Sequence, residues 1–405
     1  MVLPSIKALN LQGKRIFLRV DLNVPLDNGL IVHDFRLKAI LPTLQHIIKA
    51  GGKIILATHL GRPHPYDHSR ILYDESLSTK HLLPWFKDQG FLINYEKDLV
   101  TAHHKSRQYP NHILLLENLR FFHSERETNQ HFAELLGFLG DIYINDAFAM
   151  IHRHDTSVTL LAQQFPPENR AFGLLAEKEL GEFLKLRENK NDALTLVVGG
   201  NKVHDKIPML KYFMNPDNHP NLTSICVGGG VGLAFLKAQG YECGSTVIDD
   251  ETIATAQEIL TLAGEHKIKI VLPEDHVVSD NTAQELFTVK TTEQIPSNGV
   301  SVDIGPQTIQ VFTKEINQAK LLFANGTMGI YEKPASAKGT RAILDAIANT
   351  QAHTVVGGGD TVAAACLFGF ENKFSFTSTG GGATLAFLGC ETPEADMPAL
   401  AAMLT

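Results

Sequence analysis

The sequence predicts an α/β fold in which two parallel sheets are joined by a long helix. The chain has 405 residues, of which 44% are hydrophobic and 20% are charged. This composition is typical of a globular protein, and the length suits two domains. Short runs rich in Leu and β-branched residues alternate with polar or glycine-rich turns and with stretches of helical spacing. Such alternation is typical of βα units, which form parallel sheets.

Four buried strands are predicted in the first half of the chain, and each ends in side chains that can do chemistry. They cover residues 15–23, 53–59, 112–118 and 141–146. Ligands of open α/β sheets bind beyond the carboxyl ends of the strands. The residues at these strand ends therefore indicate what the first half binds.

Six further strands are predicted in the second half, and most of them end in glycine. They cover residues 194–200, 224–230, 268–275, 320–326, 353–360 and 374–382. Because their ends differ in chemistry from those of the first half, we expect the two halves to hold different ligands.

A long helix is predicted between the two groups of strands, at residues 173–189. Leu and Phe side chains recur there at mixed helical spacing among charged residues, as expected for a helix that bridges two sheets. We place the domain boundary in this helix, with one domain at 1–172 and the other at 190–390.

The segments that follow the strands of the first half carry a candidate basic site. Because parallel strand ends converge, four arginines should surround a few other polar groups. The planar guanidinium binds phosphate and carboxylate through paired hydrogen bonds, so the set suits a small phosphorylated carboxylic acid. For any single arginine, a solvated surface position is the alternative. The set is Asp21, Asn23, Arg36, His59, Arg62, Arg120, His152 and Arg153.

The second half carries a candidate nucleotide site. Three glycine triplets, at 228–230, 357–359 and 380–382, each follow an apolar run and precede a helix-like stretch. Glycine lets the backbone approach a ligand closely, and a helix N-terminus offers free N–H groups to phosphate. For a single triplet, a tight turn is the alternative, but three at the same topological position favour a nucleotide cradle.

Charged residues complete the predicted cradle. Lys202 and Lys206 are four apart, so we expect both ammonium groups on one face of a starting helix, within reach of phosphate oxygens. Asp360 follows a triplet, where its carboxylate suits Mg²⁺ and Thr361 suits a helix cap; a plain N-cap role is the alternative for Asp360. The sequence has no GxxxxGKS or GxxxxGKT loop and no GxGxxG motif, which counts against P-loop enzymes and dinucleotide dehydrogenases.

Charge and composition exclude other classes of protein. The formal net charge of −8 disfavours a broad nucleic-acid surface. Cys226, Cys243, Cys366 and Cys390 lack metal-ligand spacing and suit a reducing compartment. No apolar run is long enough to span a membrane, and the first ten residues do not resemble a signal peptide. We therefore expect a cytoplasmic protein.

The ordered set of motifs resembles phosphoglycerate kinases over nearly the full length. The matching segments are RVDLNVP at 19–25, LPT at 41–43, HLGRP at 59–63, LENLRF at 116–121, NDAF at 145–148, HR at 152–153, KEL at 178–180, DIGP at 303–306, GGGD at 357–360 and STGGG at 378–382. The resemblance implies two Rossmann-like domains with mainly parallel sheets, joined by a bridging helix and a hinge. It also implies that the tail, 391–405, returns to the first domain.

Carried over position by position, the resemblance implies the role of each site residue. Arg36, Lys202 and Lys206 would act on the phosphoryl group in transfer, with Mg²⁺ held by Asp360. The residues that would bind 3-phosphoglycerate are Asp21, Asn23, Arg36, His59, Arg62, Arg120 and Arg153. Those that would bind ADP or ATP are Lys202, Lys206, Gly228, Gly229, Asn325, Glu332, Gly358, Gly359, Asp360 and Thr361.

Three segments depart from the family pattern. The WNGPMG-type loop reads ANGTMG at 324–329, Asn201 replaces a small residue, and 149–155 reads AMIHRHD. A loop without its proline should be looser. The altered loop leaves open a non-catalytic relative that keeps the fold as a binding or scaffold protein. A separate alternative is a kinase of another small phosphorylated acid.

The implied reaction is reversible transfer of the acyl phosphate of 1,3-bisphosphoglycerate to MgADP, which gives 3-phosphoglycerate and MgATP. No general base is needed, because the acceptor is already ionised. Since the two ligands are expected on different domains, transfer should require hinge closure, which also excludes water. The family is usually monomeric, and we expect neither a nucleic-acid nor a membrane partner.

Overall fold

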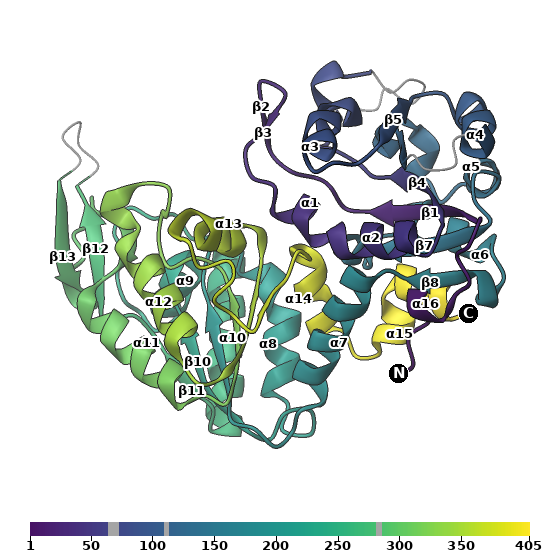
Figure 1. The fold of residues 1–405 in the computed structure, drawn as a ribbon. Coiled ribbons are helices and arrows are strands. Elements are labelled where there is room, and N and C mark those ends of the chain that lie inside the picture. The colour runs from purple at the N-terminus through teal and green to yellow at the C-terminus, as the bar shows by residue number, and fades with distance from the viewer. Residues whose placement is uncertain (64–72, 109–112, 281–285) are drawn as a thin grey trace. The chain divides into compact units, whose positions relative to one another are not determined.

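The computed structural model describes residues 1–63, 73–108, 113–280 and 286–405, and the chain divides into two compact units. Unit 1 comprises residues 1–181 and 392–405, and unit 2 comprises residues 182–391. Figure 1 shows that each unit is built of strands with helices packed around them. The predicted two-domain α/β class with parallel sheets is confirmed.

Unit 1 contains a six-stranded sheet in which every neighbouring pair is parallel. The strand order is β5-β6-β4-β1-β7-β8. The strands are β1 (Arg15–Val20), β4 (Lys53–Ala57), β5 (Ile93–Glu96), β6 (Ile113–Leu116), β7 (Ile142–Asp146) and β8 (Arg170–Phe172). The four predicted strands of this half all form, although position 112 of the third lies outside the described residues. The sequence did not predict β5 or β8.

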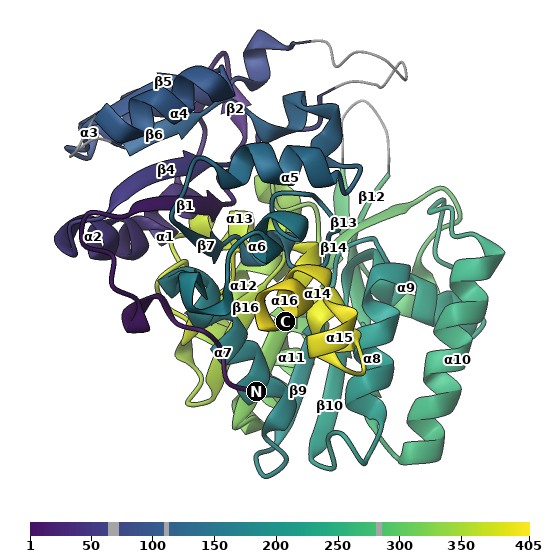
Figure 2. The ribbon, with the colours of Figure 1, turned by 90° about the vertical axis from the view of Figure 1, so that its right-hand side faces the viewer.

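Helices cover both faces of this sheet. Alternation along β1 places Ile16, Leu18 and Val20 in the core that Leu44 and Ile47 complete from α2. Phe17 lies on the other face and stacks on Tyr143. Figure 2 shows α2 on one side of β1 and α5 and α6 on the other. The helices are α1 (Phe35–Ala39), α2 (Leu41–Lys49), α3 (Leu83–Asp88), α4 (Leu99–Gln108), α5 (Gln130–Gly137), α6 (Leu160–Gln163), α15 (Pro393–Asp396) and α16 (Pro398–Leu404), and a hairpin joins β2 (Leu26–Asp27) to β3 (Leu30–Ile31).

Unit 2 repeats this plan and adds a second sheet. Its six-stranded parallel sheet has the order β11-β10-β9-β15-β16-β17, and a separate antiparallel sheet has the order β13-β12-β14. The strands are β9 (Leu194–Val198), β10 (Leu222–Val227), β11 (Lys269–Val271), β12 (Asp275–Ser279), β13 (Phe287–Thr291), β14 (Val300–Ile304), β15 (Leu321–Asn325), β16 (His353–Gly357) and β17 (Phe376–Thr377).

The prediction of a single strand at 268–275 was wrong. Strand β11 ends at Val271 and β12 begins at Asp275 in the other sheet. Pro273 separates them, and proline cannot donate to a sheet ladder. The other five predicted strands of this half all form within the parallel sheet.

The helices of unit 2 pack on both sides of its parallel sheet, as Figure 1 shows for α11 and α12 on one side and α8 and α14 on the other. Phe312 and Ile343 bring α11 and α12 into one core with β9 and β15. The helices are α8 (Ile207–Met214), α9 (Gly229–Ala238), α10 (Asp250–His266), α11 (Pro306–Gln318), α12 (Lys338–Asn349), α13 (Gly359–Phe368) and α14 (Gly382–Gly389).

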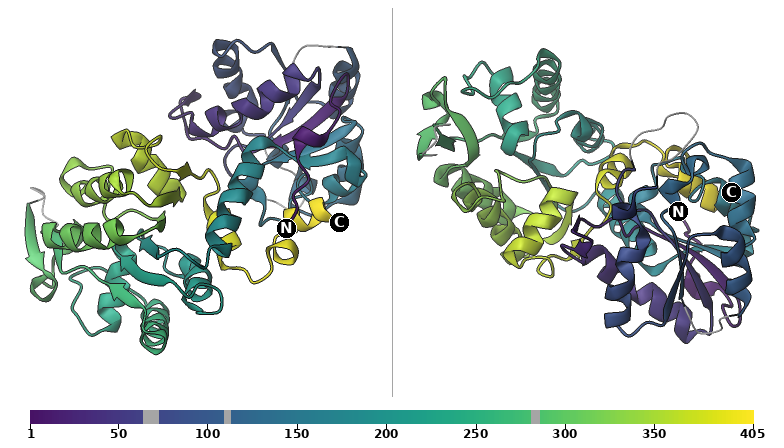
Figure 3. Two further views of the ribbon diagram at one scale, coloured as in Figure 1. Left: turned by 60° about the horizontal axis from the view of Figure 1, so that its bottom comes forward. Right: turned by 90° about the horizontal axis from the view of Figure 1, so that it is seen from above.

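The long helix between the strand groups is α7 (Leu174–Glu188), and the division between the units falls within it, after Gly181. The domain limits expected at residues 172, 190 and 390 stay predictions, and so does the hinge. Figure 3 shows both chain ends in the same unit. In unit 1, Ser5 forms an isolated parallel β-bridge with Phe172, and the Ala399 amide donates to the carbonyl of Ile151.

Candidate active site

The basic site of unit 1 forms where β1 and β4 end. Asp21 directly follows β1 and forms an ion pair with Arg36 on α1. His59 follows β4, and its Nε2 lies 3.9 Å from Oδ1 of Asp21. Burial by itself would raise the pKa of Asp21, but the positive charge of Arg36 and the other nearby groups lower it to about 2. Asp21 is therefore a carboxylate throughout the neutral range.

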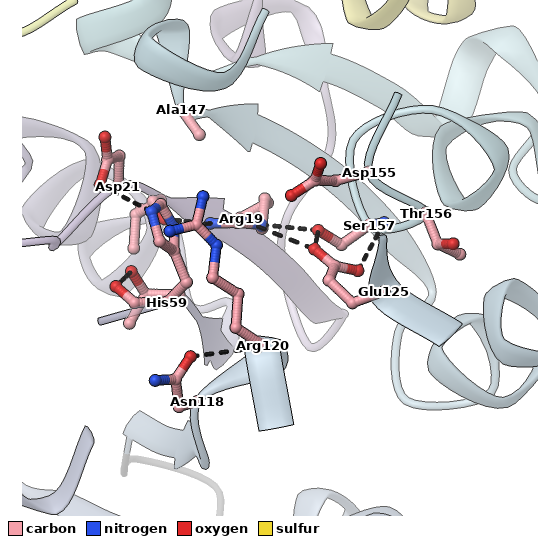
Figure 4. A network of polar contacts seen from close by, with 12 residues as sticks. Arg19, Asp21, His59, Asn118, Arg120, Glu125, Ala147, Asp155, Thr156 and Ser157 are labelled. Carbon is pink, nitrogen blue, oxygen red and sulfur yellow. Dashed lines mark hydrogen bonds and ion pairs between the residues drawn. The ribbon is translucent and has the colours of Figure 1, made fainter. Parts of the chain in front are cut away.

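His59 is held in its neutral form. The ring is 2% exposed, and burial lowers its pKa well below the usual value. The charge of Asp21 opposes this shift, but Arg120, Arg19 and Arg36 reinforce it. Figure 4 shows Asp21, His59 and Arg120 grouped in one network. The ring nitrogens of His59 thus serve as uncharged hydrogen-bonding groups at neutral pH, and the arginines provide the positive charge of the site.

Asn23 and Arg120 both hold the loop that follows His59. The side-chain oxygen of Asn23 accepts from the Gly61 amide at 2.7 Å, and Arg120 donates to the Gly61 carbonyl at 2.6 Å. Burial lowers the pKa of Arg120 to about 10, with Arg126 adding to the shift, so Arg120 stays charged at neutral pH. Within the described residues, its buried Nε has no hydrogen-bond partner, which leaves a charged donor available for an anion.

The remaining predicted residues of this site differ in how closely they join it. Arg153 is half-buried and close enough to Arg120 to lower the pKa of that guanidinium. Burial lowers the pKa of the neighbouring His152. Arg62 is exposed, and no hydrogen bond or ion pair joins it to the others within the described residues. The structure thus brings six of the seven predicted substrate residues together and leaves Arg62 at the edge.

Unit 2 contains a cavity of about 660 Å³ at the glycine-rich ends of its strands. Nine of the ten predicted nucleotide residues line it. The exception is Gly228, where a Cβ atom would lie 2.5 Å from the sulfur of Met328, so this glycine makes room for packing behind the cavity wall. The nine are Lys202, Lys206, Gly229, Asn325, Glu332, Gly358, Gly359, Asp360 and Thr361.

The prediction that both lysines lie on one helix face was wrong. Pro208 suits the first turn of a helix, and α8 begins only at Ile207. Lys202 therefore lies in the preceding loop, exposed to the cavity. The ammonium of Lys206 is buried and donates to the Lys202 carbonyl at 3.1 Å, and burial lowers the pKa of Lys206. Both lysines still line the same cavity.

The prediction that Thr361 caps a helix was also wrong. Helix α13 begins earlier, at Gly359, because Gly358 adopts φ +102° and takes the N-cap position. The Thr361 hydroxyl instead accepts from the Gly326 amide at 2.7 Å, which ties α13 to the loop after β15. Asp360 is left in the first turn, exposed at the cavity wall, and its charge acts on Lys206. An exposed carboxylate in the first turn of a helix at this cavity fits Mg²⁺, which usually binds one or two carboxylates plus phosphates.

The altered loop at 324–329 is held by backbone contacts. The Thr327 carbonyl accepts from the Gly200 amide at 2.7 Å, and the Met328 amide donates to the Thr340 hydroxyl at 3.0 Å. Gly326 lies so close to Gly199 that a Cβ atom would approach the Gly199 carbonyl oxygen to 2.1 Å. These contacts join the ends of β9 and β15 at the cavity despite the absence of the usual Trp and Pro.

Comparison with known proteins gives one consistent family. The family model described as phosphoglycerate kinase matches residues 6–391. The chain belongs to the phosphoglycerate kinase family. A curated phosphoglycerate kinase from Dictyoglomus turgidum (strain DSM 6724 / Z-1310) is 39% identical over 388 residues, which cover 95% of each chain.

Solved structures of the family agree. The phosphoglycerate kinase of Coxiella burnetii matches with a TM-score of 0.82 and 32% identity, over 100% of this chain and 99% of the other. That of Pyrococcus horikoshii OT3 matches with a TM-score of 0.84 and 27% identity, over 99% and 98%. The chain is thus a phosphotransferase of glycolysis, and the readings as a non-catalytic relative or as a kinase of another acid are not supported. Among the described residues, the structure has no helix with the length and apolarity needed to cross a bilayer.

Three residues beside the basic site of unit 1 were not predicted from the sequence. Arg19, Glu125 and Ser157 form a buried polar cluster that reaches His59. One signal was available for Arg19, because a charged residue in the middle of an otherwise apolar strand requires buried partners. No local pattern indicated Glu125, in a short 3-10 helix, or Ser157, in a turn, and both are remote from Arg19 in the sequence.

Proposed function

We propose that the basic site of unit 1 binds 3-phosphoglycerate and that the cavity of unit 2 binds a magnesium nucleotide. The observation that carries this assignment is the ion pair of Asp21 with Arg36, surrounded by His59 and Arg120 at converging strand ends. These residues give unit 1 the charged and hydrogen-bonding groups that a phosphorylated hydroxy acid needs in its binding site.

Each chemical group of 3-phosphoglycerate has a suitable partner in this proposal. The guanidinium groups of Arg36, Arg62, Arg120 and Arg153 suit the carboxylate and phosphate. Asp21 stays ionised and so accepts a hydrogen bond from the substrate hydroxyl. The Nε of Arg120 is buried and has no hydrogen-bond partner in the part of the chain that the structure describes, which supports a role in holding an anion.

For the nucleotide, the proposal assigns phosphate binding to the lysines and to the start of α13. Lys202 and Lys206 line the cavity beside Gly358 and Gly359, whose backbone N–H groups meet phosphate at a helix N-terminus. Asp360 would hold Mg²⁺, which when bound neutralises charge on the phosphates. Glu332 would bind the ribose, and Thr361 would join Asp360 at the phosphates. Gly229 and Asn325 would line the cleft, with Gly228 packed behind its wall.

The reaction itself needs positioning and charge neutralisation. The attacking and leaving oxygens must lie in line, and negative charge spreads over the equatorial oxygens of the transferred group. Arg36 would stabilise that charge from the side of the acid, and Lys202 and Lys206 from the side of the nucleotide. Because the two ligands are assigned to different units, we propose that hinge closure precedes transfer and excludes water. The form that we propose is a cytoplasmic monomer, in keeping with four free cysteines.

A coupled assay of ATP consumption that depends on 3-phosphoglycerate tests this assignment. We expect Arg36→Ala to lower turnover at least about 100-fold, since one arginine that stabilises a transferring phosphoryl group contributes about 10³ to 10⁵ in rate. Lys38→Ala, on the same helix α1 and exposed, is the matched control and should keep near-normal turnover. Circular dichroism checks that both variants fold. Near-normal turnover of a folded Arg36→Ala variant would refute the role of Arg36.

A further inference from the structure

A buried arginine lies behind His59, on the face of β1 that also carries Phe17. Arg19 is 0% exposed and has a polar contact for each nitrogen of its guanidinium. Its Nε donates to the Ser157 hydroxyl at 2.7 Å, and one terminal nitrogen donates to the Val20 carbonyl. The other terminal nitrogen lies 3.8 Å from a Glu125 oxygen and 3.4 Å from Nδ1 of His59. Figure 4 shows this network.

Ser157 and Glu125 hold the guanidinium in one orientation. The Ser157 hydroxyl accepts from Arg19 and donates to Glu125 at 2.5 Å, while the Ser157 amide donates to the other oxygen of Glu125 at 3.0 Å. The Ser157 carbonyl in turn accepts from the Tyr143 hydroxyl at 2.8 Å. Because Ser157 and Glu125 are themselves held by hydrogen bonds, Arg19 cannot turn its terminal nitrogen away from His59 without losing several hydrogen bonds.

The contact with Arg19 decides where His59 carries its proton. A guanidinium has only donors, so Nδ1 of His59 must be the acceptor. A neutral imidazole has one N–H, which then belongs to Nε2, and Nε2 faces Oδ1 of Asp21 at 3.9 Å. The charges that face the ring come from Asp21, Arg19, Arg36 and Arg120. Burial lowers the pKa of His59 and thus favours the neutral ring on which this argument depends.

We infer that Arg19 is a positioning residue, which keeps His59 in the Nε2–H tautomer so that this N–H points to the Asp21 side of the substrate site. Ser157 and Glu125 act one step further away by holding Arg19. The inference rests on the proposed function for its consequence, namely that a correctly directed His59 N–H improves binding of 3-phosphoglycerate. The tautomer itself does not depend on that function.

The tautomer is measured directly on the unmodified enzyme. Long-range ¹H–¹⁵N correlation spectra distinguish Nε2–H, Nδ1–H and doubly protonated rings, and His59→Gln identifies the His59 signals among the 18 histidines. At pH 7.5 without ligands, we expect a single neutral Nε2–H tautomer. A proton on Nδ1, a charged ring or a mixture of exchanging tautomers would overturn the inference.

Substitution of Arg19 tests its effect on the substrate site. The ammonium of Arg19→Lys cannot reach His59 and Ser157 together, so we expect exchanging His59 tautomers and a KM for 3-phosphoglycerate raised about tenfold, or about 1.4 kcal/mol. The KM for MgATP should change less than about twofold. Arg15→Lys is the matched control, since Arg15 lies on the same strand and pairs with Asp141 away from His59. Ser157→Ala removes both the acceptor for Arg19 and the donor to Glu125, and it should shift the tautomer in the same direction if Arg19→Lys fails to fold.

The outcomes separate the inference from the proposed function. If folded Arg19→Lys and Ser157→Ala keep the single Nε2–H tautomer, or if Arg15→Lys disturbs it equally, the positioning role is overturned. If the tautomer shifts as expected but neither these variants nor His59→Gln alter the KM for 3-phosphoglycerate, the positioning role stands and the assignment of His59 to the substrate site fails.

Discussion

Asp21 and Asp360 follow strand ends in the two units, and their surroundings give them different chemistry. Asp21 is 8% exposed and paired with Arg36, with a pKa lowered to about 2. It is thus an acceptor held in one orientation. Asp360 is exposed in the first turn of α13 at the cavity wall. Its oxygens can reach a hydrated cation, which a buried and paired carboxylate cannot do without losing its partner.

Removal of the Asp360 carboxylate should therefore affect one ligand only. We expect Asp360→Ala to weaken binding of the magnesium nucleotide by at least about tenfold, or about 1.4 kcal/mol, because the proposed metal site loses a carboxylate. Affinity for 3-phosphoglycerate should stay unchanged. Calorimetric titration of each ligand measures both effects, with Asp345→Ala, an exposed carboxylate on α12, as the control. Equal loss for both ligands would contradict a metal-binding role.

At the scale of elements, apolar runs predicted the parallel sheets well and the antiparallel sheet poorly. The strand β1 is buried on both faces, so its sequence is a largely apolar run, which is followed by the charged Asp21. In contrast, none of the five residues of β13 is buried: two are exposed and three are partly exposed. Such a strand has no apolar run to find. Its pairing with β12 depends on tertiary contacts that local sequence does not encode.

The contrast between what topology determines and what local contacts determine also explains which predictions at the two sites succeeded. Asp21, Arg36, His59 and Arg120 could be predicted because strand ends converge by topology. The details that failed were local. The start of α8 at Ile207 depends on Pro208, and the start of α13 depends on Gly358 at φ +102°. The buried cluster joins Arg19 to Glu125 and Ser157, which both lie more than 100 residues later in the sequence, and only the fold brings them together.

Helix α7 begins on a buried carboxylate, which gives this element a pH dependence. Oδ1 of Asp146 accepts from the Ala176 amide at 2.8 Å, and burial raises the pKa of Asp146 from 3.8 to about 6. Between these values the folded state binds more protons than the unfolded state. The contribution of Asp146 to the free energy of unfolding therefore falls as the pH rises from about 4 to 6, by roughly 3 kcal/mol in total.

Asp146→Asn cannot titrate, so its stability relative to the unmodified enzyme should rise over that same interval of pH. Thermal unfolding followed at pH 4.5, 5.5 and 7 measures this difference. Asp141→Asn provides a comparison of opposite sign, since Arg15 lowers the pKa of Asp141 despite partial burial. That substitution should become more harmful as pH rises from acid to neutral. A stability difference for Asp146→Asn that does not vary with pH would contradict the buried-carboxylate argument.

At the scale of the whole molecule, the chain leaves unit 1, builds unit 2 and returns, so unit 1 depends on residues at both ends of the sequence. Helix α16 packs on α6 and β8, and Leu400 is 0% exposed. The Ala399 amide donates to the Ile151 carbonyl at 3.1 Å, directly before His152 and Arg153. The last residues of the chain thus support a segment of the proposed 3-phosphoglycerate site.

Leu400→Ala should accordingly affect stability and one substrate together. Loss of a fully buried leucine costs about 2 to 5 kcal/mol, so we expect a clear fall in the midpoint of thermal unfolding. Since the segment around Ile151 loses support, the KM for 3-phosphoglycerate should rise below that midpoint while the KM for MgATP stays near normal. Leu404→Ala, on the same helix and 37% exposed, should change neither constant. If Leu400→Ala raised both KM values equally, the tail would act on the whole enzyme and not through unit 1.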